Sequence, residues 1–272
     1  MKILDVKKQK PKQKNIEPEV NYDEIVSKFK KGSLAKDYLY RLLSKVDSSH
    51  APSTHIEILI ASGLPIVKKN QRYILETKTT LYKEQIFCIV DIETNGSKAP
   101  KDQIIEIGAV KYQNGKIIDN FKSLVYTKSI PVHVSKVTNI TIEDLKDAPK
   151  NRDVLKAFKL FLADSVFVAH NVKFDYNFIS AWLEKIGYGK LVNRHLCSID
   201  LAKRTINSSK FGLQHLKEYL NIDEHIMHRA YEDALATAKV FEYSLNQLPQ
   251  NIKTTEDLID FSKSDNIIAK TN

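Results

Sequence analysis

The chain has 272 residues, of which 42% are hydrophobic, so it can hold one large domain or a domain with a smaller companion. Its formal net charge of +9 fits an anionic partner. Two cysteines without a CxxC pair argue against a disulfide framework or a thiolate zinc site. No apolar run approaches the roughly 18 residues of a membrane span, and the basic start lacks the apolar core of a signal peptide. We therefore expect a soluble, cytoplasmic protein without membrane contact.

The first segments of the chain are basic and then helical. Residues 1–20 are rich in lysine and contain two prolines, which predicts a disordered basic tail. Spaced apolar residues predict helix over 22–47. The stretch STHIEILIASG predicts a further helix, which Ser53 can cap and Gly63 can end.

A short hairpin follows in LPIVKKNQRYILE, with its turn expected near Lys69–Asn70. Helices followed by a basic hairpin indicate a small extension over residues 21–80. Two interpretations stay open: a winged-helix module, or a helical extension that only packs on its neighbour.

From residue 85 the pattern becomes that of an α/β domain. Three strands are predicted in QIFCIVDIE and QIIEIGAVKYQNGKIIDNFKSLVY, with a tight turn at Asn114–Gly115, and a fourth in SVFVAHN. Helices are predicted near 141–146, 151–163, 198–206, 213–220 and 230–246, and in KFDYNFISAWLEKIG, which ends at Gly187. This order favours a mixed sheet with helices on its faces. Residues 247–272 are expected to form a tail with one short helix, begun by a capping box from Thr254 to Asp257.

Four acidic residues stand where core residues are expected. Asp91 and Glu93 come directly after the apolar run that ends at Val90. Asp175 falls on the apolar stripe of its helix, and Asp233 falls on the small-residue face of the helix over 230–246. One such acid is usually structural, as a helix cap or an arginine partner. Four buried carboxylates together are costly unless a cation balances them, and all-oxygen ligands favour Mg²⁺ or Mn²⁺.

The segments DIETNG, HNVKFD and HRAYEDA resemble, in order and form, the three motifs of the DEDD-type 3′–5′ exonucleases of the histidine branch. The resemblance covers residues 84–246 and extends to the proofreading epsilon subunits of bacterial DNA polymerase III. It implies a ribonuclease H-like fold with a mixed five-stranded sheet. It also implies two divalent metal ions, Mg²⁺ or Mn²⁺, and release of nucleoside monophosphates from the 3′ ends of single-stranded DNA. The site residues that it implies are the metal ligands Asp91, Glu93, Asp175 and Asp233, and His228 as the general base.

Five further residues are candidates for substrate contact. The resemblance implies that the backbone at Thr94 and Asn95 meets the terminal nucleotide, and His170, Asn171 and Phe174 surround the second motif. Asn171 is equally suited to capping the next helix. Phe174 could stack on a base or belong to the core.

Two departures from the family pattern affect substrate preference: Asn95 is inserted after Thr94, and Asn139 stands where a glycine is common. The leading hypothesis is a DNA 3′–5′ exonuclease that proofreads replication, with a polymerase subunit as a possible partner. An RNA 3′–5′ exonuclease and a catalytically inactive nucleic-acid-binding module are the alternatives.

Overall fold

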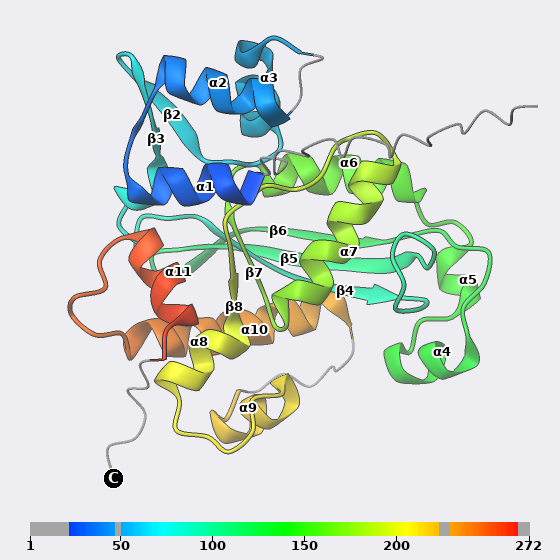
Figure 1. Cartoon of the computed structure of the whole chain (residues 1–272). Helices are drawn as coiled ribbons and strands as arrows, with labels where there is room; N and C mark the ends of the chain where they lie inside the picture. The colour runs from blue at the N-terminus through cyan, green and yellow to red at the C-terminus, as the bar shows by residue number, and fades with distance from the viewer. Residues whose placement is uncertain (1–21, 47–49, 223–228, 266–272) are drawn as a thin grey trace, which may run out of the picture.

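The computed structural model describes residues 22–46, 50–222 and 229–265 (Figure 1). The predicted tail over 1–20 lies outside the described residues. None of the described helices is both long enough and apolar enough to span a bilayer.

The N-terminal module combines three helices with a small antiparallel sheet in the order β1-β3-β2. Its elements are α1 (Tyr22–Lys31), β1 (Leu34–Ala35), α2 (Lys36–Val46), α3 (Pro52–Ala61), β2 (Ile66–Lys69), β3 (Arg72–Leu75) and the 3-10 helix η1 (Glu76–Lys78). These elements run in the order helix, strand, two helices and two strands. The module also has its own cluster of buried side chains, which includes Ile25, Phe29, Leu39, Leu43 and Leu59.

Two local predictions for this module are corrected. The expected helix over 22–47 is divided into α1 and α2, because Leu34 leaves the helix to pair with Tyr73 of β3. Ser53 is not the cap of α3: Ala51 holds that position and Pro52 begins the helix, where its missing N–H costs nothing. The end at Gly63 is confirmed by its φ of +100°, and the hairpin turn at Asn70 is confirmed by the β2–β3 pairing.

The main sheet has five strands in the order β6-β5-β4-β7-β8, which confirms the predicted mixed sheet. The strands are β4 (Phe87–Thr94), β5 (Ile104–Gln113), β6 (Lys116–Leu124), β7 (Val166–Ala169) and β8 (His195–Cys197). The β4–β5 and β5–β6 pairs are antiparallel, whereas the β4–β7 and β7–β8 pairs are parallel. Positive φ at Asn114 (+48°) and Gly115 (+77°) confirms the predicted turn. β8 was not predicted, because three residues carry too little alternation to be recognised.

Helices cover both faces of this sheet (Figure 1). They are α4 (Val132–Thr138), α5 (Ile142–Leu145), α6 (Asn151–Leu162), α7 (Val172–Lys185), α8 (Ser198–Thr205), α9 (Leu213–Tyr219), α10 (Ala230–Asn246) and α11 (Thr255–Lys263). α6 and α7 pack on one face, while α8, α10 and α11 pack on the other. β4 is apolar at successive positions because Cys88, Val90 and Ile92 face the first layer and Phe87 and Ile89 face the second.

The expected C-terminal tail is corrected for residues 255–263. The capping box of α11 is present at Thr254 and Asp257, but Leu258 and Ile259 are fully buried in the core beneath the sheet. Burial of these side chains removes apolar surface from water and makes α11 part of the folded domain.

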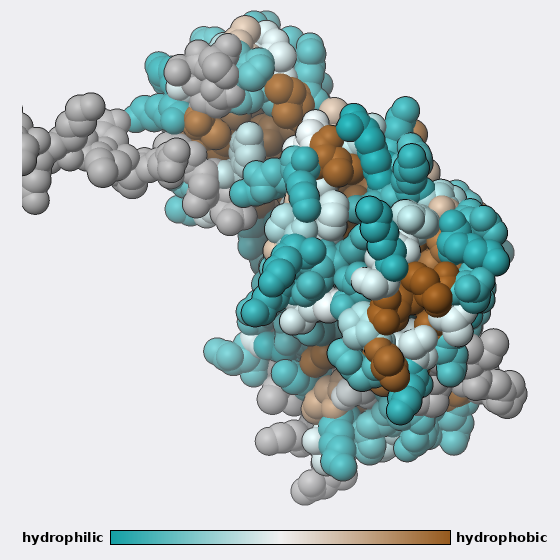
Figure 2. Space-filling model, turned by 90° about the vertical axis from the view of Figure 1, so that its right-hand side faces the viewer, coloured by the Kyte–Doolittle hydropathy of each residue, from teal (hydrophilic) through white to brown (hydrophobic). Residues whose placement is uncertain are grey.

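A buried junction connects α11, the sheet and the N-terminal module. Arg194 Nε donates to Glu256 Oε1 at 2.7 Å, and the Thr77 hydroxyl donates to the same oxygen at 2.8 Å. In the view of Figure 2 the N-terminal module forms a smaller lobe above the main one, and the hydrophobic groups on this face are separated by hydrophilic side chains.

Candidate active site

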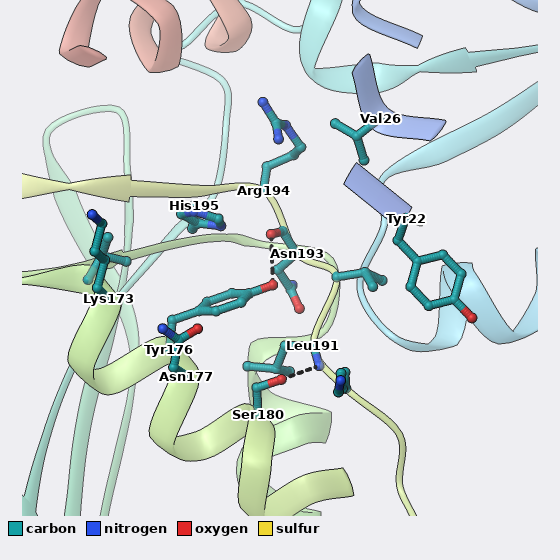
Figure 3. A pocket seen from close by; sticks show the side chains of 13 residues that line it. Tyr22, Val26, Lys173, Tyr176, Asn177, Ser180, Leu191, Asn193, Arg194 and His195 are labelled. Carbon is teal, nitrogen blue, oxygen red and sulfur yellow. Dashed lines mark hydrogen bonds between the residues drawn. The ribbon is translucent and has the colours of Figure 1, made fainter. Parts of the chain in front are cut away.

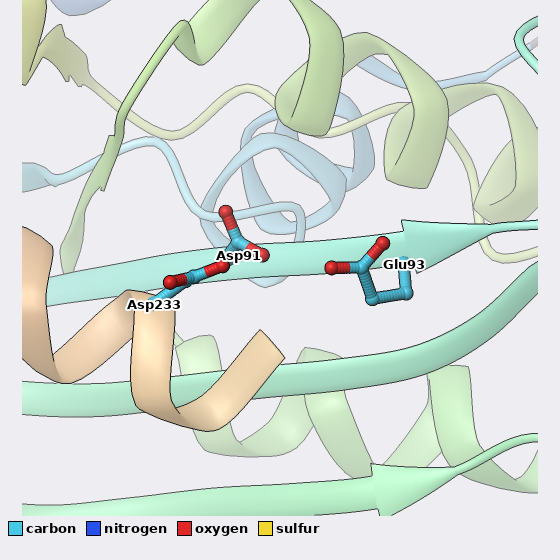
Figure 4. Close-up of side chains that lie close together, drawn as sticks. All are labelled: Asp91, Glu93 and Asp233. Atoms are coloured by element: carbon cyan, nitrogen blue, oxygen red, sulfur yellow. The ribbon is translucent and has the colours of Figure 1, made fainter. Parts of the chain in front are cut away.

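Three carboxylates converge at one end of the main sheet. Asp91 and Glu93 lie two residues apart on β4, so both point to the α10 side, and Asp233 meets them from the first turn of α10 (Figure 4). One oxygen from each of the three lies within 4.8 Å of the others. A register shift between Glu93 and Thr94 interrupts the regular β4–β5 pairing beside this cluster.

Helix α10 can approach β4 this closely because of Gly108. Gly108 pairs with Asp91 across the β4–β5 ladder. A Cβ atom added to Gly108 would lie 2.1 Å from the backbone nitrogen of Tyr231. Any side chain here would therefore push the start of α10, and Asp233 with it, away from Asp91.

Glu106 fixes the start of α10. This fully buried carboxylate accepts hydrogen bonds from Arg229 Nη2 at 2.8 Å and Nε at 3.0 Å, and from the Ala230 backbone N–H at 3.0 Å. A negative charge at a helix N-terminus is favourable. Glu106 lies on β5, and through these bonds it positions the helix that carries Asp233.

Asp175 approaches the cluster from the opposite layer. It is 4% exposed on the first turn of α7, and its Oδ1 accepts a hydrogen bond from the Ile92 backbone N–H at 3.2 Å. The β4–β7 pairing ends at Ile89, so Asp175 occupies the side of β4 where the neighbouring strand has stopped. Asp175 therefore borders the three-carboxylate cluster instead of lying within it.

Burial and mutual repulsion raise the pKa values of these acids. Burial, followed by the charges of Asp175, Glu93 and Asp233, raises the pKa of Asp91 well above its usual value. Burial raises the pKa of Glu93 to about 7, with further increases from Asp233 and Glu106, and burial raises the pKa of Asp175 to about 8. A divalent cation would relieve this repulsion, and a set of carboxylate oxygens is the donor chemistry that hard divalent ions prefer.

Three of the candidate substrate residues, Thr94, Asn95 and Phe174, differ in what their side chains contact. Thr94 ends β4 beside the cluster. The Asn95 side chain holds the following loop, since its Oδ1 accepts from the Gln103 N–H at 2.7 Å and its Nδ2 donates to Ser129 O at 3.3 Å. Phe174 is half-buried and packs against Phe178, with ring centroids 5.6 Å apart.

His170 and Asn171 serve the local fold. His170 lies 2.9 Å from Ser198 Oγ through Nδ1 and 2.8 Å from Phe211 O through Nε2, and burial lowers its pKa to about 4. Asn171 occupies the N-cap position of α7 with φ +84°, and its backbone oxygen accepts from the Phe174 N–H. The prediction that Asn171 is the N-cap residue of this helix is confirmed, but its side chain makes no cap hydrogen bond. His228 lies outside the described residues.

Comparison with known proteins places these residues in a family. A family model described as an exonuclease (RNase_T) matches residues 88–241. The PolC-type DNA polymerase III of Staphylococcus aureus is 35% identical over 196 residues, which are 71% of this chain and 13% of that protein. The chain thus spans only a small part of this curated relative.

Solved structures show the same fold. Exonuclease X in complex with 5′-overhanging duplex DNA superposes with a TM-score of 0.53 and 24% identity, over 65% of this chain and 99% of that one. E. coli exonuclease I in complex with a dT13 oligonucleotide has a TM-score of 0.55 and 16% identity, over 60% of this chain and 42% of that one. Because the family match spans more than half of the chain and includes all four acids of the site, the chain belongs to the exonuclease family.

Proposed function

We propose that this exonuclease is a metal-dependent enzyme that removes nucleoside monophosphates from DNA 3′ ends, in the manner of a replication proofreader. The observation that carries the proposal is the convergence of Asp91, Glu93 and Asp233 within 4.8 Å, bordered by Asp175. The PolC-type DNA polymerase III and the exonucleases solved with DNA support DNA as the substrate. A DNA polymerase subunit is the proposed protein partner on the basis of the same PolC-type relative.

The four acids would hold two divalent ions, Mg²⁺ or Mn²⁺. Such ions, when bound, supply positive charge to the attacking and leaving oxygens of the phosphodiester. The carboxylates themselves must give up protons to bind, which the raised pKa values of Glu93 and Asp175 make costly below neutral pH. His228, five residues before Asp233, is the proposed general base for the attacking water.

The test uses single- and double-stranded DNA and RNA, each labelled at the 5′ end, incubated with Mg²⁺, Mn²⁺ or EDTA. We expect a ladder of DNA products that shorten stepwise from the 3′ end with either ion and no products in EDTA. Release of internal fragments, or equal activity in EDTA, would overturn the proposal. Faster degradation of RNA than of DNA would assign the enzyme to RNA, and absence of cleavage under every condition would favour a binding module.

A further inference from the structure

A cleft lies where the N-terminal module meets the exonuclease domain, between α1, α7 and the segment that leads into β8 (Figure 3). Its volume is about 390 Å³, within the ~300–1,000 Å³ range of small-molecule sites. Tyr22 and Val26 enter it from α1, and Lys173 and Tyr176 enter it from α7.

The cleft is basic. Lys173, Lys190, Arg194 and His195 line it, and among the described residues that line it there is no Asp or Glu. The charge of Arg194 is balanced by Glu256 in the buried junction. Lys190 lies 3.5 Å from Glu184, but both side chains are more than half exposed, and such pairs bind weakly. Lys173 and Lys190 therefore give the cleft its positive charge.

Aromatic and apolar groups accompany these lysines. The ring of Tyr176 is fixed by a hydrogen bond from its hydroxyl to Asn193 O at 3.1 Å and by an edge contact with Phe167. Tyr22 lines the cleft from the other lobe, and Val26 and Leu191 add apolar surface. Cationic groups for a phosphate next to aromatic and apolar surface for a base form the combination that holds a nucleotide.

The position of the cleft connects it to the carboxylates. Lys173 and Asp175 share the first turn of α7, with Asp175 buried toward β4 and Lys173 exposed in the cleft. Resting on the proposed function, we propose that this cleft is a second nucleotide-binding site, which holds a nucleotide of the single strand whose 3′ end lies at the acids. The N-terminal module, through Tyr22, thus forms one wall of a substrate path.

Two sources could supply this ligand chemistry: an internal nucleotide of the strand or a free nucleoside monophosphate. The experiment measures binding of a fluorescein-labelled oligothymidine of about 20 nucleotides, longer than the ~4–16-nucleotide sites of single-strand binders. Full-length protein is used in EDTA, so that binding is read without cleavage. Competition with dTMP and with polyglutamate separates strand binding from monophosphate binding and from general anion binding.

The variants are Lys173→Ala/Lys190→Ala and Tyr22→Ala. Loss of two phosphate contacts should lower the slope of log affinity against log salt by about 1.4, at ~0.7 per contact for single strands. Loss of stacking on Tyr22 should weaken binding roughly five- to 160-fold. The matched control Lys83→Ala/Lys116→Ala removes the same charge from exposed positions outside the cleft. Lys116 begins β6, at the opposite edge of the sheet from β8. This control should have the same slope of log affinity against log salt as wild type.

Cleavage of the dinucleotide dTpdT in Mg²⁺ should be the same in wild type and both variants, because its single phosphodiester is the bond that the acids would hydrolyse and leaves no phosphate for the cleft. Unchanged oligothymidine affinity in both variants would overturn the second site. If dTMP displaces the oligothymidine from wild type but not from the variants, the cleft binds the free monophosphate and not the strand. If polyglutamate displaces the oligothymidine as well as dTMP does, the cleft binds anions in general and the proposal is overturned. Failure of the proposed nuclease activity is distinguishable, because it would appear as no dinucleotide cleavage in wild type while the binding result in EDTA still stands.

Discussion

At the scale of single residues, the positions of the acids determine both charge and stability. Asp233 reaches Asp91 and Glu93 from a separate helix, and its charge raises the pKa of each of them. Without metal, the site therefore holds mutually repelling carboxylates that are partly removed from water, and this lowers the free energy of unfolding. Exchange of stability for activity is common at functional sites.

We predict that Asp233→Asn removes most nuclease activity and melts at the same or a higher temperature than wild type in EDTA. The amide keeps the shape of the side chain and removes one repelling charge. Its gain in melting temperature on adding Mg²⁺ or Mn²⁺ should be smaller than that of wild type, because ions stabilise the state that binds them. Thermal melts with and without metal measure both effects. Asp164→Asn, an exposed control, should behave as wild type. Strong destabilisation of Asp233→Asn in EDTA would mean that the carboxylate holds the fold.

His228→Ala should lower kcat by roughly 10²–10⁴, the usual contribution of a general base. Metal binding should survive, because the imidazole is not one of the proposed ligands. Steady-state kinetics with labelled DNA measure the first effect, and the metal-induced rise in melting temperature measures the second. His50→Ala, in the N-terminal module, is the matched control. Wild-type turnover in His228→Ala would remove this residue from the mechanism.

At the scale of elements, the placement of Asp233 depends on how α10 is attached to β5. Gly108 allows the close approach, and Glu106 holds Arg229 and the Ala230 N–H. The helix start is thereby fixed by an ion pair whose carboxylate is fully buried and by close approach of two backbones, and not by the carboxylate cluster itself.

Arg229→Ala should destabilise the protein by about 3 kcal/mol, because it leaves the fully buried Glu106 carboxylate without its cation. Glu106→Gln should cost less, because the remaining charge, on Arg229, is 29% exposed and can be hydrated. The double variant should cost less than the sum of the two by about 0.5–3 kcal/mol, as expected for residues in one network. Chemical denaturation of the four proteins in EDTA measures the cycle, with Glu143→Gln at an exposed helix pair as a control within about 0.5 kcal/mol of wild type. Additive effects would show that the pair does not act as a unit.

At the scale of the whole molecule, the two lobes are joined by buried contacts. Thr77 of the N-terminal module and Arg194 before β8 both bond to Glu256 of α11. Hydrogen bonding to Arg194 and Thr77 outweighs burial and lowers the pKa of Glu256. Deletion of the module up to a point between residues 78 and 85 would remove Thr77 and expose the buried Arg194–Glu256 pair. The Tyr22→Ala variant therefore tests the role of the module better than its deletion.

The buried junction predicts one cooperative unfolding transition for the chain. Circular dichroism and near-ultraviolet signals should report the same midpoint, as they do for a two-state unit. Glu256→Ala should separate or broaden the transition, because Thr77 of the N-terminal module and Arg194 of the main lobe then both lose their acceptor. Two resolved transitions in wild type would show that the lobes fold independently.

Stability in EDTA should fall as pH rises from 6.5 to 8. Glu93 and Asp175 have pKa values raised to about 7 and about 8, so the folded state retains protons that the unfolded state has lost. Unfolding then releases protons, and higher pH favours it. His170, whose pKa is lowered from 6.5 to about 4, acts in the opposite direction, but only below its unfolded value of 6.5.

Melting temperatures in EDTA across this pH range, repeated with Mg²⁺, measure the effect. Saturating metal should abolish the fall, and Glu93→Gln should reduce it. A melting temperature that rises or stays constant in EDTA would contradict the raised pKa values.

The sequence by itself determined the local structure and the chemistry. Four of the five strands of the main sheet, the turn at Asn114–Gly115 and most helices follow from periodicity and turn residues, and three short motifs identify the exonuclease family. These features are recognisable because hydrophobic period and turn chemistry depend on residues near one another in the chain.

The tertiary structure alone decided how these parts meet. It places Asp91, Glu93 and Asp233 in one cluster and Asp175 on the other layer, makes Glu106 the anchor of α10, and packs α11 into the core. Periodicity shows which face of a helix is buried but not which strand it faces or how closely it approaches. That distance is set by side chains far away in the sequence, such as the missing Cβ of Gly108, more than 120 residues before Tyr231.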